Sequence, residues 1–244
     1  MRRFTLQPDR LAGGRVTFGP DESRHLARVL RLRPGDTVLA TDGTGRDFTV
    51  RLESLGDAVT GTVLAEAADD AVSPLAVTLV QGVPKGDKME TIVRAATELG
   101  VARVRPALCE RTIVRLEPAR WRERARRWQR VAREAAKQCG RATIPQIEAP
   151  RPLAEWLAPA EPVDLALCLW EGGGTPLGRV LATAAAPRSA TTLIGPEGGL
   201  APAEVETARA HGFAIVSLGR RILRTETAGP AITAILQSRF GDLG

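Results

Sequence analysis

Hydrophobic and polar residues alternate over short stretches of the first 70 residues, with the two-residue period of half-buried β-strands. A helical period interrupts these stretches once, at about residues 22–30. Asp42-Gly43 lies between two of the stretches and is a typical hairpin dipeptide. The pattern predicts a compact β-rich module. The stretches expected as strands are 15–18, 37–40, 47–55 and 59–64.

The pattern changes after residue 74, where apolar runs of strand length alternate with segments of helical period. Such alternation is typical of a mostly parallel sheet with helices on its faces. The segment 67–74 is small, polar and ends in Pro74, so we expect a linker there and two domains, 1–70 and 74–244. The expected strands of the second domain are 76–80, 104–107, 163–169, 192–194 and 215–218, and its expected helices are 87–99, 118–140, 202–211 and 226–240.

Two glycine-bearing turns, within residues 191–200 and 216–228, combine a strand-like run with the start of a helix. Glycine allows the backbone to approach a ligand closely, and ligands of α/β sheets bind outside the carboxyl ends of the strands. We therefore expect the two turns to form two walls of one small-molecule site. A pair of ordinary strand-to-helix turns is the alternative.

Neither turn has the signature of a phosphate or dinucleotide site. The first turn, Gly195-Pro-Glu-Gly-Gly199, lacks the G-x-G-x-x-G spacing, and the segment Gly82–Lys88 lacks the Gly-Lys pair of a P-loop. A carboxylate at the mouth of the first turn, that of Glu197, suits a cationic ligand better than a phosphate.

Positive charge is concentrated in two parts of the chain, residues 1–33, with eight arginines against three acidic residues, and residues 111–141. The net charge is +6, and residues 111–141 contain eleven Arg and Lys residues against three acidic ones. A clustered basic surface indicates a polyanion partner such as nucleic acid, although an arginine-rich solvated helix would have the same composition. At helical spacing, one face carries Trp121, Ala125, Trp128, Ala132, Ala135 and Cys139, and the other carries Arg122, Arg126, Arg130, Arg133 and Lys137.

Several classes of chemistry are not expected. Three scattered cysteines and two histidines are too few for a zinc site or a disulfide framework, so we expect no metal. His25, His211 and Cys168 are expected to be structural. No apolar run is long enough to span a membrane, and the first residues do not resemble a secretory signal, which predicts a cytoplasmic protein. After these exclusions, we expect Arg and Glu side chains between residues 197 and 226 to carry out the chemistry, together with a reacting group carried by a cofactor.

The glycine turns resemble those of a known family, the bacterial ribosomal RNA small-subunit methyltransferase E family. The resemblance extends over almost the whole chain. Its motifs are 193–200, 218–227 and 239–244, together with 25–31, 85–90, 96–101, 109–111 and 138–141. It implies an α/β fold of the SPOUT class with a C-terminal deep trefoil knot, an N-terminal PUA-like β-barrel domain and a homodimer.

The resemblance also implies an activity, transfer of a methyl group from S-adenosylmethionine to N3 of a uridine in 16S ribosomal RNA. Arg224 is expected to stabilise the anionic uracil oxygen, and Glu226 or Glu197 to accept the N3 proton. Alternatively, Glu226 only favours the start of the last helix. The expected cofactor-binding residues are Leu169, Ile194, Gly195, Glu197, Gly199, Leu218, Gly219, Ile222, Leu223 and Thr225. The expected RNA-binding residues are Arg2, Arg3, Arg28, Arg31, Lys85, Lys88, Arg111, Arg126, Arg130, Arg133, Lys137 and Arg141.

Two other functions fit the same sequence. A non-catalytic RNA-binding factor in ribosome assembly would use the same basic surface and would bind no S-adenosylmethionine. A methyltransferase of the same class acting on transfer RNA would differ only in its substrate.

Overall fold

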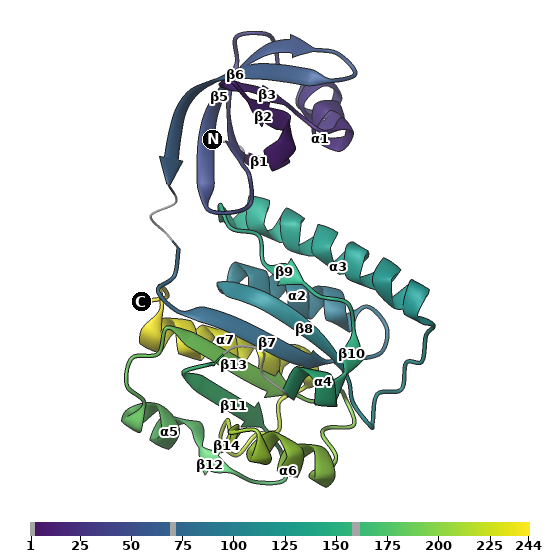
Figure 1. The fold of residues 1–244 in the computed structure, drawn as a ribbon, viewed down its shortest axis with the longest axis vertical. Coiled ribbons are helices and arrows are strands. Elements are labelled where there is room, and N and C mark those ends of the chain that lie inside the picture. The colour runs from purple at the N-terminus through teal and green to yellow at the C-terminus, as the bar shows by residue number, and fades with distance from the viewer. Residues whose placement is uncertain (1–2, 69–71, 158–161) are drawn as a thin grey trace. The chain divides into compact units, whose positions relative to one another are not determined.

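The computed structural model describes residues 3–68, 72–157 and 162–244 (Figure 1). The chain forms two compact units. The smaller unit comprises Met1–Val72 with Arg133–Ile144, and the larger unit comprises Ser73–Ala132 with Pro145–Gly244. The long helix α3 (Pro118–Cys139) therefore contributes its C-terminal part to the smaller unit and its remainder to the larger one.

The smaller unit is built on a curled six-stranded sheet (Figure 1). The strands run in the order β1 (Arg3–Thr5), β4 (Thr37–Thr41), β5 (Arg46–Leu55), β6 (Val59–Ala68), β3 (Arg15–Thr17) and β2 (Leu11–Ala12). β1 and β4 are parallel, and the other neighbours are antiparallel. The expected β-rich module is confirmed, including the hairpin that turns at Asp42-Gly43 between β4 and β5.

The smaller unit also contains short helical turns and a core with three buried phenylalanines. η1 (Pro8–Arg10) precedes β2, and α1 (Pro20–Arg24) continues into the π-helical turn η2 (His25–Val29), as the helical period had indicated. Phe4, Phe18 and Phe48 are fully buried in the core. His25 is exposed, and its ring packs edge-on against Phe4.

The C-terminal part of α3 is held in the smaller unit by ion pairs with little solvent access. Lys137 Nζ lies 2.7 Å from Glu22 Oε1 and 3.2 Å from Glu134 Oε1, and only 11% of the Lys137 side chain is exposed. Arg3 pairs with Asp47 at a similarly low exposure. Removing one partner of such a pair leaves a buried charge uncompensated. The Lys137–Glu22 pair therefore fixes the C-terminal part of α3 to α1, and the Arg3–Asp47 pair joins β1 to β5.

The larger unit contains a parallel sheet (Figure 1). Its strands run in the order β10 (Arg151–Pro152), β8 (Val101–Leu108), β7 (Ala76–Gly82), β13 (Ser189–Ile194), β11 (Leu165–Leu169), β14 (Ala214–Ser217) and β12 (Thr175–Pro176), and β9 (Gln146–Ile147) also pairs with β8. All these pairs are parallel, which confirms the mostly parallel sheet expected from the alternation of strands and helices.

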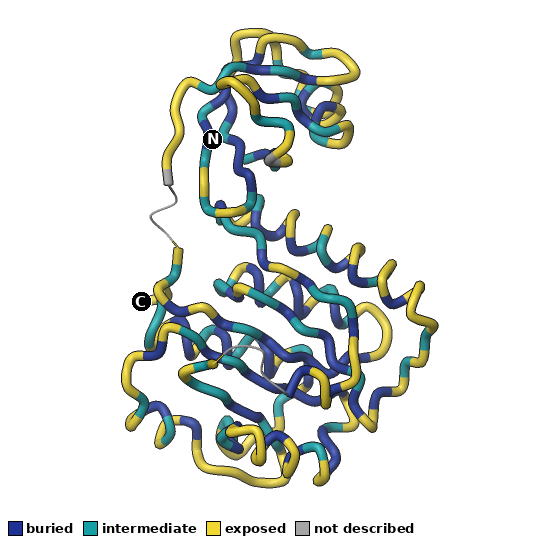
Figure 2. The backbone as a smooth tube through the Cα atoms, in the orientation of Figure 1, coloured by how far each residue is buried: buried dark blue, intermediate teal, exposed yellow. Residues whose placement is uncertain are grey.

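Helices cover both faces of this sheet and bury two apolar clusters (Figure 2). One cluster joins the sheet to α2 (Lys88–Glu98), α3, α5 (Leu177–Thr183) and α7 (Thr225–Phe240). The other joins it to α4 (Leu153–Leu157) and α6 (Pro202–Ala210). Neighbouring strand residues such as Leu79 and Val80 are both buried, one in each cluster, because the strands are covered on both sides.

The expected helices α2, α3, α6 and α7 are present within one or two residues of their predicted ends. The apolar face of α3 is buried as predicted, except that Cys139 at its C-terminal end is exposed. The short elements β1, β2, β9, β10, β12, α4 and α5 were not predicted. They are too short for periodicity to reveal them.

Gln237 is the main polar link between α7 and the rest of the larger unit. Its side chain is fully buried. Its Nε2 donates to the carbonyl oxygens of Gly100, at 2.9 Å, and Leu75, at 3.4 Å, and its Oε1 accepts from Ser73 Oγ at 2.6 Å. One side chain thus joins the last helix to the start of β7 and to the turn before β8.

We predict that Gln237→Leu lowers the free energy of unfolding by roughly 1–3 kcal/mol, because buried backbone carbonyls are left without their donor. Urea unfolding followed by circular dichroism measures this change. Ser238→Ala, at the exposed next position, is the control and is expected to stay within about 0.5 kcal/mol of the unchanged protein. Equal midpoints for the two variants would contradict a structural role for Gln237.

Candidate functional site

The two glycine turns lie at the same edge of the parallel sheet. One follows β13 and the other follows β14, and β11 lies between these strands in the sheet. Because parallel strands present their carboxyl ends at one edge, the residues after Ile194 and after Ser217 meet there. The expectation that the two turns form walls of one site agrees with this arrangement.

A cavity of about 500 Å³ opens between the turns. All ten residues expected to bind the cofactor line it, as do Arg224 and Glu226, the two expected catalytic residues. Lys88, expected to bind RNA, also lines this cavity. Trp170, Glu171, Arg220 and Arg221 line it too, and sequence reasoning did not assign them. For Arg220 and Arg221, two adjacent basic residues within the second turn, the sequence did carry a signal that could have indicated a place in the site.

The first turn is shaped by close backbone contacts. A Cβ atom added to Gly195 would lie 2.8 Å from the carbonyl carbon of Gly199, and one added to Gly82 at the end of β7 would lie 2.5 Å from the nitrogen of Pro196. Gly199 has a φ of +70°, in the left-handed region, where side chains are strained. These glycines therefore have a structural role in forming the cavity wall.

Thr225 joins the second turn to the first. Its buried hydroxyl donates to the carbonyl oxygen of Gly195 at 2.7 Å and accepts from Gln81 Nε2 at 2.9 Å. The first residue of α7, the first glycine turn and the end of β7 thus meet at one hydroxyl group. The Thr225 side chain is engaged in these contacts, so it supports the cavity wall.

A lysine lies between two carboxylates at the rim of the cavity. Lys88 Nζ is 3.1 Å from Glu197 Oε1 and 3.5 Å from Glu226 Oε2. Hydrogen bonding to Glu197 is the main reason why the pKa of Lys88 lies above its ordinary value. Burial disfavours the charged form of Glu197, but hydrogen bonds from its own amide, Lys88 and the Lys85 amide outweigh burial and lower its pKa. Both groups are therefore charged at neutral pH.

Three arginines of the second turn are exposed beside this rim: Arg220, Arg221 and Arg224. Within the described residues, the Arg224 side chain makes no hydrogen bond or ion pair. The rim thus combines exposed cationic groups with fixed carboxylates, which is a suitable environment for a cation and an anionic substrate together.

The expected RNA-binding residues fall into several groups. Arg126, Arg130 and Arg133 are exposed on α3. Arg28 and Arg31 are exposed in the smaller unit, and Arg31 has a φ of +53°.

Other members of this set are engaged in contacts within the protein. Arg3 and Lys137 are mostly buried in the ion pairs of the smaller unit, and Arg141 donates to Thr143 Oγ1 at 3.1 Å. Arg111 Nη1 donates to the Gly198 carbonyl oxygen at 2.9 Å, beside the exposed Lys85. Arg2 lies outside the described residues.

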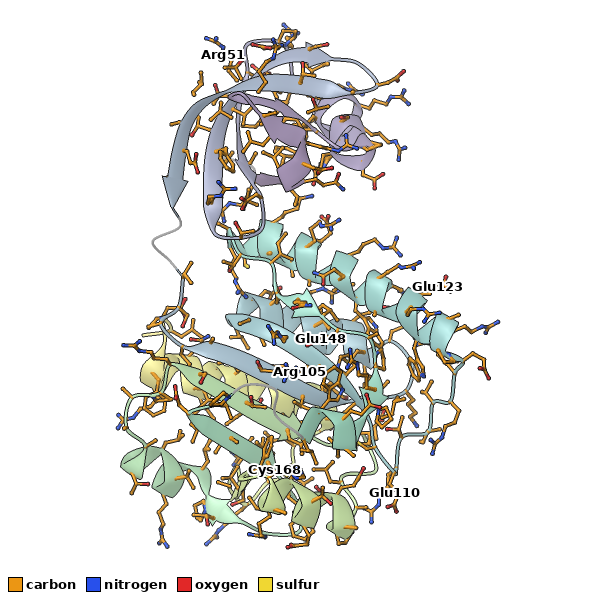
Figure 3. All side chains as sticks on the ribbon, in the orientation of Figure 1. Arg51, Arg105, Glu110, Glu123, Glu148 and Cys168 are labelled. Carbon is orange, nitrogen blue, oxygen red and sulfur yellow. The ribbon has the colours of Figure 1, made fainter. Side chains whose placement is uncertain are left out.

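Cysteine and histidine do not contribute to the cavity. Cys168 is fully buried in the larger unit (Figure 3), where burial raises its pKa to about 12, so it is a small apolar side chain as predicted. His211 Nδ1 lies 2.8 Å from the Thr207 carbonyl oxygen. In the part of the chain that the structure describes, no three potential metal ligands cluster, and no helix is long and apolar enough to cross a membrane.

Comparison with known families identifies both parts of the chain. Residues 71–237 match an RNA methyltransferase domain, and residues 18–63 match an RNA methyltransferase PUA domain. The chain is similar to ribosomal RNA small subunit methyltransferase E from Synechocystis, with 36% identity over 97% of this chain and 78% of the relative. The Bacillus subtilis protein of the same name is 32% identical over 85% of this chain and 84% of that protein.

Solved structures agree with the sequence comparison. The chain is similar to ribosomal RNA small subunit methyltransferase E from Neisseria gonorrhoeae bound to S-adenosyl methionine, with a TM-score of 0.89, 35% identity and full coverage of both chains. A putative methyltransferase from Legionella pneumophila, in complex with the same cofactor, has a TM-score of 0.89 and 29% identity over 99% of this chain and 98% of that chain. The matched domains, the near-complete coverage and the common fold show that this chain belongs to the ribosomal RNA small subunit methyltransferase E family.

Proposed function

We propose that this protein transfers a methyl group from S-adenosylmethionine to N3 of a uridine in the 16S ribosomal RNA of the small ribosomal subunit. The observation that carries the proposal is the cavity where the expected cofactor and catalytic residues converge. Membership of the family supports the reaction, and the cofactor in two similar structures supports the ligand.

The cavity suits S-adenosylmethionine in size and in chemistry. Its volume of about 500 Å³ lies within the roughly 300–1,000 Å³ of small-molecule sites. Leu169, Leu218, Ile222 and Leu223 offer apolar surface for the adenine ring, and the carboxylates at the rim complement a cation. When bound, the cofactor supplies an electrophilic methyl group on a positively charged sulfur.

The protein's remaining task is to prepare the uracil. Its N3 carries a proton, which must leave before N3 can form a bond to carbon. Glu226, in the first turn of α7, accepts this proton in our proposal, and Arg224 stabilises the negative charge that develops on the uracil oxygen. The contact of Glu226 with Lys88 across the rim favours this role over a purely helix-stabilising one. The target base must be unpaired or flipped to enter the cavity.

The exposed arginines of α3 provide a surface for the RNA backbone. Arg122, Arg126, Arg130 and Arg133 are exposed along the helix, on the side opposite the buried Trp121. Among the residues that the structure describes, no ion pair engages their guanidinium groups, so they can bind phosphates, which supply most of the sequence-independent affinity of nucleic-acid binding.

We further propose that the active form is a cytoplasmic homodimer with the trefoil knot that the family resemblance implies. α7 buries Ile232 and Leu236 in the core but leaves Ile235 exposed. Ile235 lies in a shallow hollow lined also by Leu181 and Ala234 from α5 and α7. Exposed apolar surface of this kind is suited to a second copy of the chain.

The test of the reaction is transfer of a labelled methyl group to naked 16S ribosomal RNA, assembled small subunits and transfer RNA in parallel, with the modified base identified by mass spectrometry. Label at N3 of a 16S uridine supports the proposal. Cofactor binding without transfer to any RNA would favour an assembly factor, and label in transfer RNA alone would change the substrate.

We predict that Ile222→Ala weakens binding of S-adenosylmethionine by roughly fivefold to thirtyfold, because partial burial of an Ile side chain contributes about 1–2 kcal/mol. Ile222 lines the cavity and is 80% exposed without a ligand, so the melting temperature should not change. Isothermal titration calorimetry measures the affinity. Ile113→Ala, at a position 67% exposed outside the cavity, is the matched control, and equal weakening in both variants would place the cofactor elsewhere.

Arg224→Ala is expected to lower kcat by a factor of about 10²–10³, as for removal of one donor to a developing oxyanion. The affinities for RNA and cofactor should change far less, because the charge on the uracil oxygen develops only during the reaction. Single-turnover kinetics and separate binding measurements check this. A variant with normal turnover would show that Arg224 does not act on the base.

Replacing Arg126, Arg130 and Arg133 together by Gln is expected to weaken RNA binding and to flatten its dependence on salt. The slope of log affinity against log salt concentration should fall by up to about 2–3 units, since each phosphate that an arginine neutralises contributes close to one unit. Cofactor affinity should not change.

The matched control for this variant replaces three other exposed arginines, Arg51, Arg179 and Arg188, by Gln. This control removes the same total charge from the protein, so only the long-range attraction between protein and RNA should weaken. Identical salt slopes for the two triple variants would show that the arginines of α3 do not bind phosphates directly.

A further inference from the structure

One contact at the rim of the cavity has a chemical consequence for the proposed reaction. Lys88 begins α2, and its ammonium group reaches carboxylates from two other segments, Glu197 in the first glycine turn and Glu226 in α7. The three side chains are each between one fifth and about one third exposed, so water screens their interaction only partly.

The two carboxylates are held unequally. Glu197 accepts from the Lys85 amide at 3.1 and 3.3 Å in addition to Lys88, so both of its oxygens are occupied. Glu226 Oε2 is buried and, within the described residues, has no hydrogen-bond partner; its contact with Lys88 is 3.5 Å long. Glu226 is therefore held by fewer hydrogen bonds than Glu197 and keeps more of its lone pairs free to accept a proton.

Two carboxylates at one rim would ordinarily disfavour each other's ionisation. A cation between them removes this penalty, and Lys88 is the cation that contacts both. The neighbouring charged groups make no hydrogen bond or ion pair with either carboxylate through their side chains, as far as the described residues show. They are Lys85, Asp87 and Glu90 from α2 and its preceding turn, Arg111 beside Gly198, Glu171 after β11, and Arg220, Arg221 and Arg224 after β14.

We propose that Lys88 is a positioning residue that keeps Glu197 and Glu226 together as carboxylates, with Glu197 as its fixed anchor and Glu226 as the acceptor of the uracil proton. This proposal rests on the methyl transfer proposed above. The N3–H bond breaks as its proton passes to a Glu226 oxygen, and its electron pair forms the bond from N3 to the methyl carbon. The electron pair of the carbon–sulfur bond remains on sulfur.

The assignment differs from the sequence-based expectation that Lys88 binds RNA. An RNA phosphate would have to displace two carboxylates from the same ammonium group. Lys85, three residues earlier, is exposed, and its backbone amide contacts Glu197. Its side chain has no ion pair within the described parts of the chain and can take that role.

The test compares Lys88→Gln and Lys88→Arg with Lys85→Gln in the full-length protein. Two quantities are measured: the pKa of Glu197 from carbon-13 NMR of the carboxyl groups without RNA or cofactor, and kcat and KM for 16S ribosomal RNA between pH 5 and 10. Lys85→Gln is the matched control, because it removes a lysine charge from the same turn but keeps the backbone contact.

In Lys88→Gln, the pKa of Glu197 should rise, since an opposite charge within about 4–6 Å lowers a carboxyl pKa by roughly 1–3 units. The same loss leaves the acceptor Glu226 beside Glu197 without a shared cation, so the acidic limb of the pH profile of kcat should move up by about one pH unit or more. The rate should recover at high pH. Lys88→Arg should restore the pKa of Glu197 and the pH at which kcat falls on the acidic side. Lys85→Gln should leave both of these unchanged.

Three results would overturn the proposal. An unchanged pKa of Glu197 in Lys88→Gln would show that Lys88 does not control the carboxylates. A raised pKa with an unmoved kcat profile would show that the pair does not take the proton. A normal kcat with a raised, salt-sensitive KM would make Lys88 a phosphate contact. In each of these cases, methyl transfer by the unchanged protein would still support the proposed function. If the unchanged protein transfers no methyl group, both the proposed function and the role of Lys88 are refuted.

Discussion

The cavity depends on the close approach of three backbone segments around Gly195. The end of β7, the turn after β13 and the first residue of α7 meet there, through the contact of Gly82 with Pro196 and the hydrogen bonds of Thr225. No side chain fits between these segments. A ligand in this cavity would therefore meet backbone groups and apolar side chains, without a Rossmann-type phosphate loop. Displacement of any one segment would alter the wall formed by the other two.

Charge at the rim is arranged for two different ligands. Fixed carboxylates face the cavity, where a cationic cofactor would bind, and exposed arginines lie beside them, where a polyanion would approach. Lys88 contacts the carboxylates of Glu197 and Glu226 at this rim. An unpaired carboxylate facing RNA would repel it, so pairing with a lysine also lowers the electrostatic cost of bringing RNA to the site.

Helix α3 has two physical roles along its length. Its middle part buries Trp121 and Trp128 in the larger unit and exposes arginines on the other side. Its C-terminal part is fixed to helix α1 of the smaller unit through the ion pair between Lys137 and Glu22. A basic residue on this helix thus binds either the protein or a ligand according to its neighbours, and the composition of the helix does not distinguish the two.

The sequence by itself determined the long elements and the place of the site. Periodicity predicted the four long helices and most of the longer strands, because amphipathic elements of sufficient length have an unambiguous period. The glycine turns predicted the cavity, since turns after parallel strands of one sheet must share an edge. The roles of Arg224 and Glu226, inferred from the chemistry of the reaction, and the trefoil knot that the family resemblance implies remain predictions.

Tertiary structure alone decided which charged side chains are free. Arg3, Lys137 and Lys88 are basic side chains like those of Arg126 and Arg130. The first three are held by carboxylates far away in the sequence, whereas the last two are exposed. Ion pairs between distant segments leave no periodic signal, because they depend on how the segments pack. The same reason explains why the buried Gln237 network and the short strands at the sheet edges were not predicted.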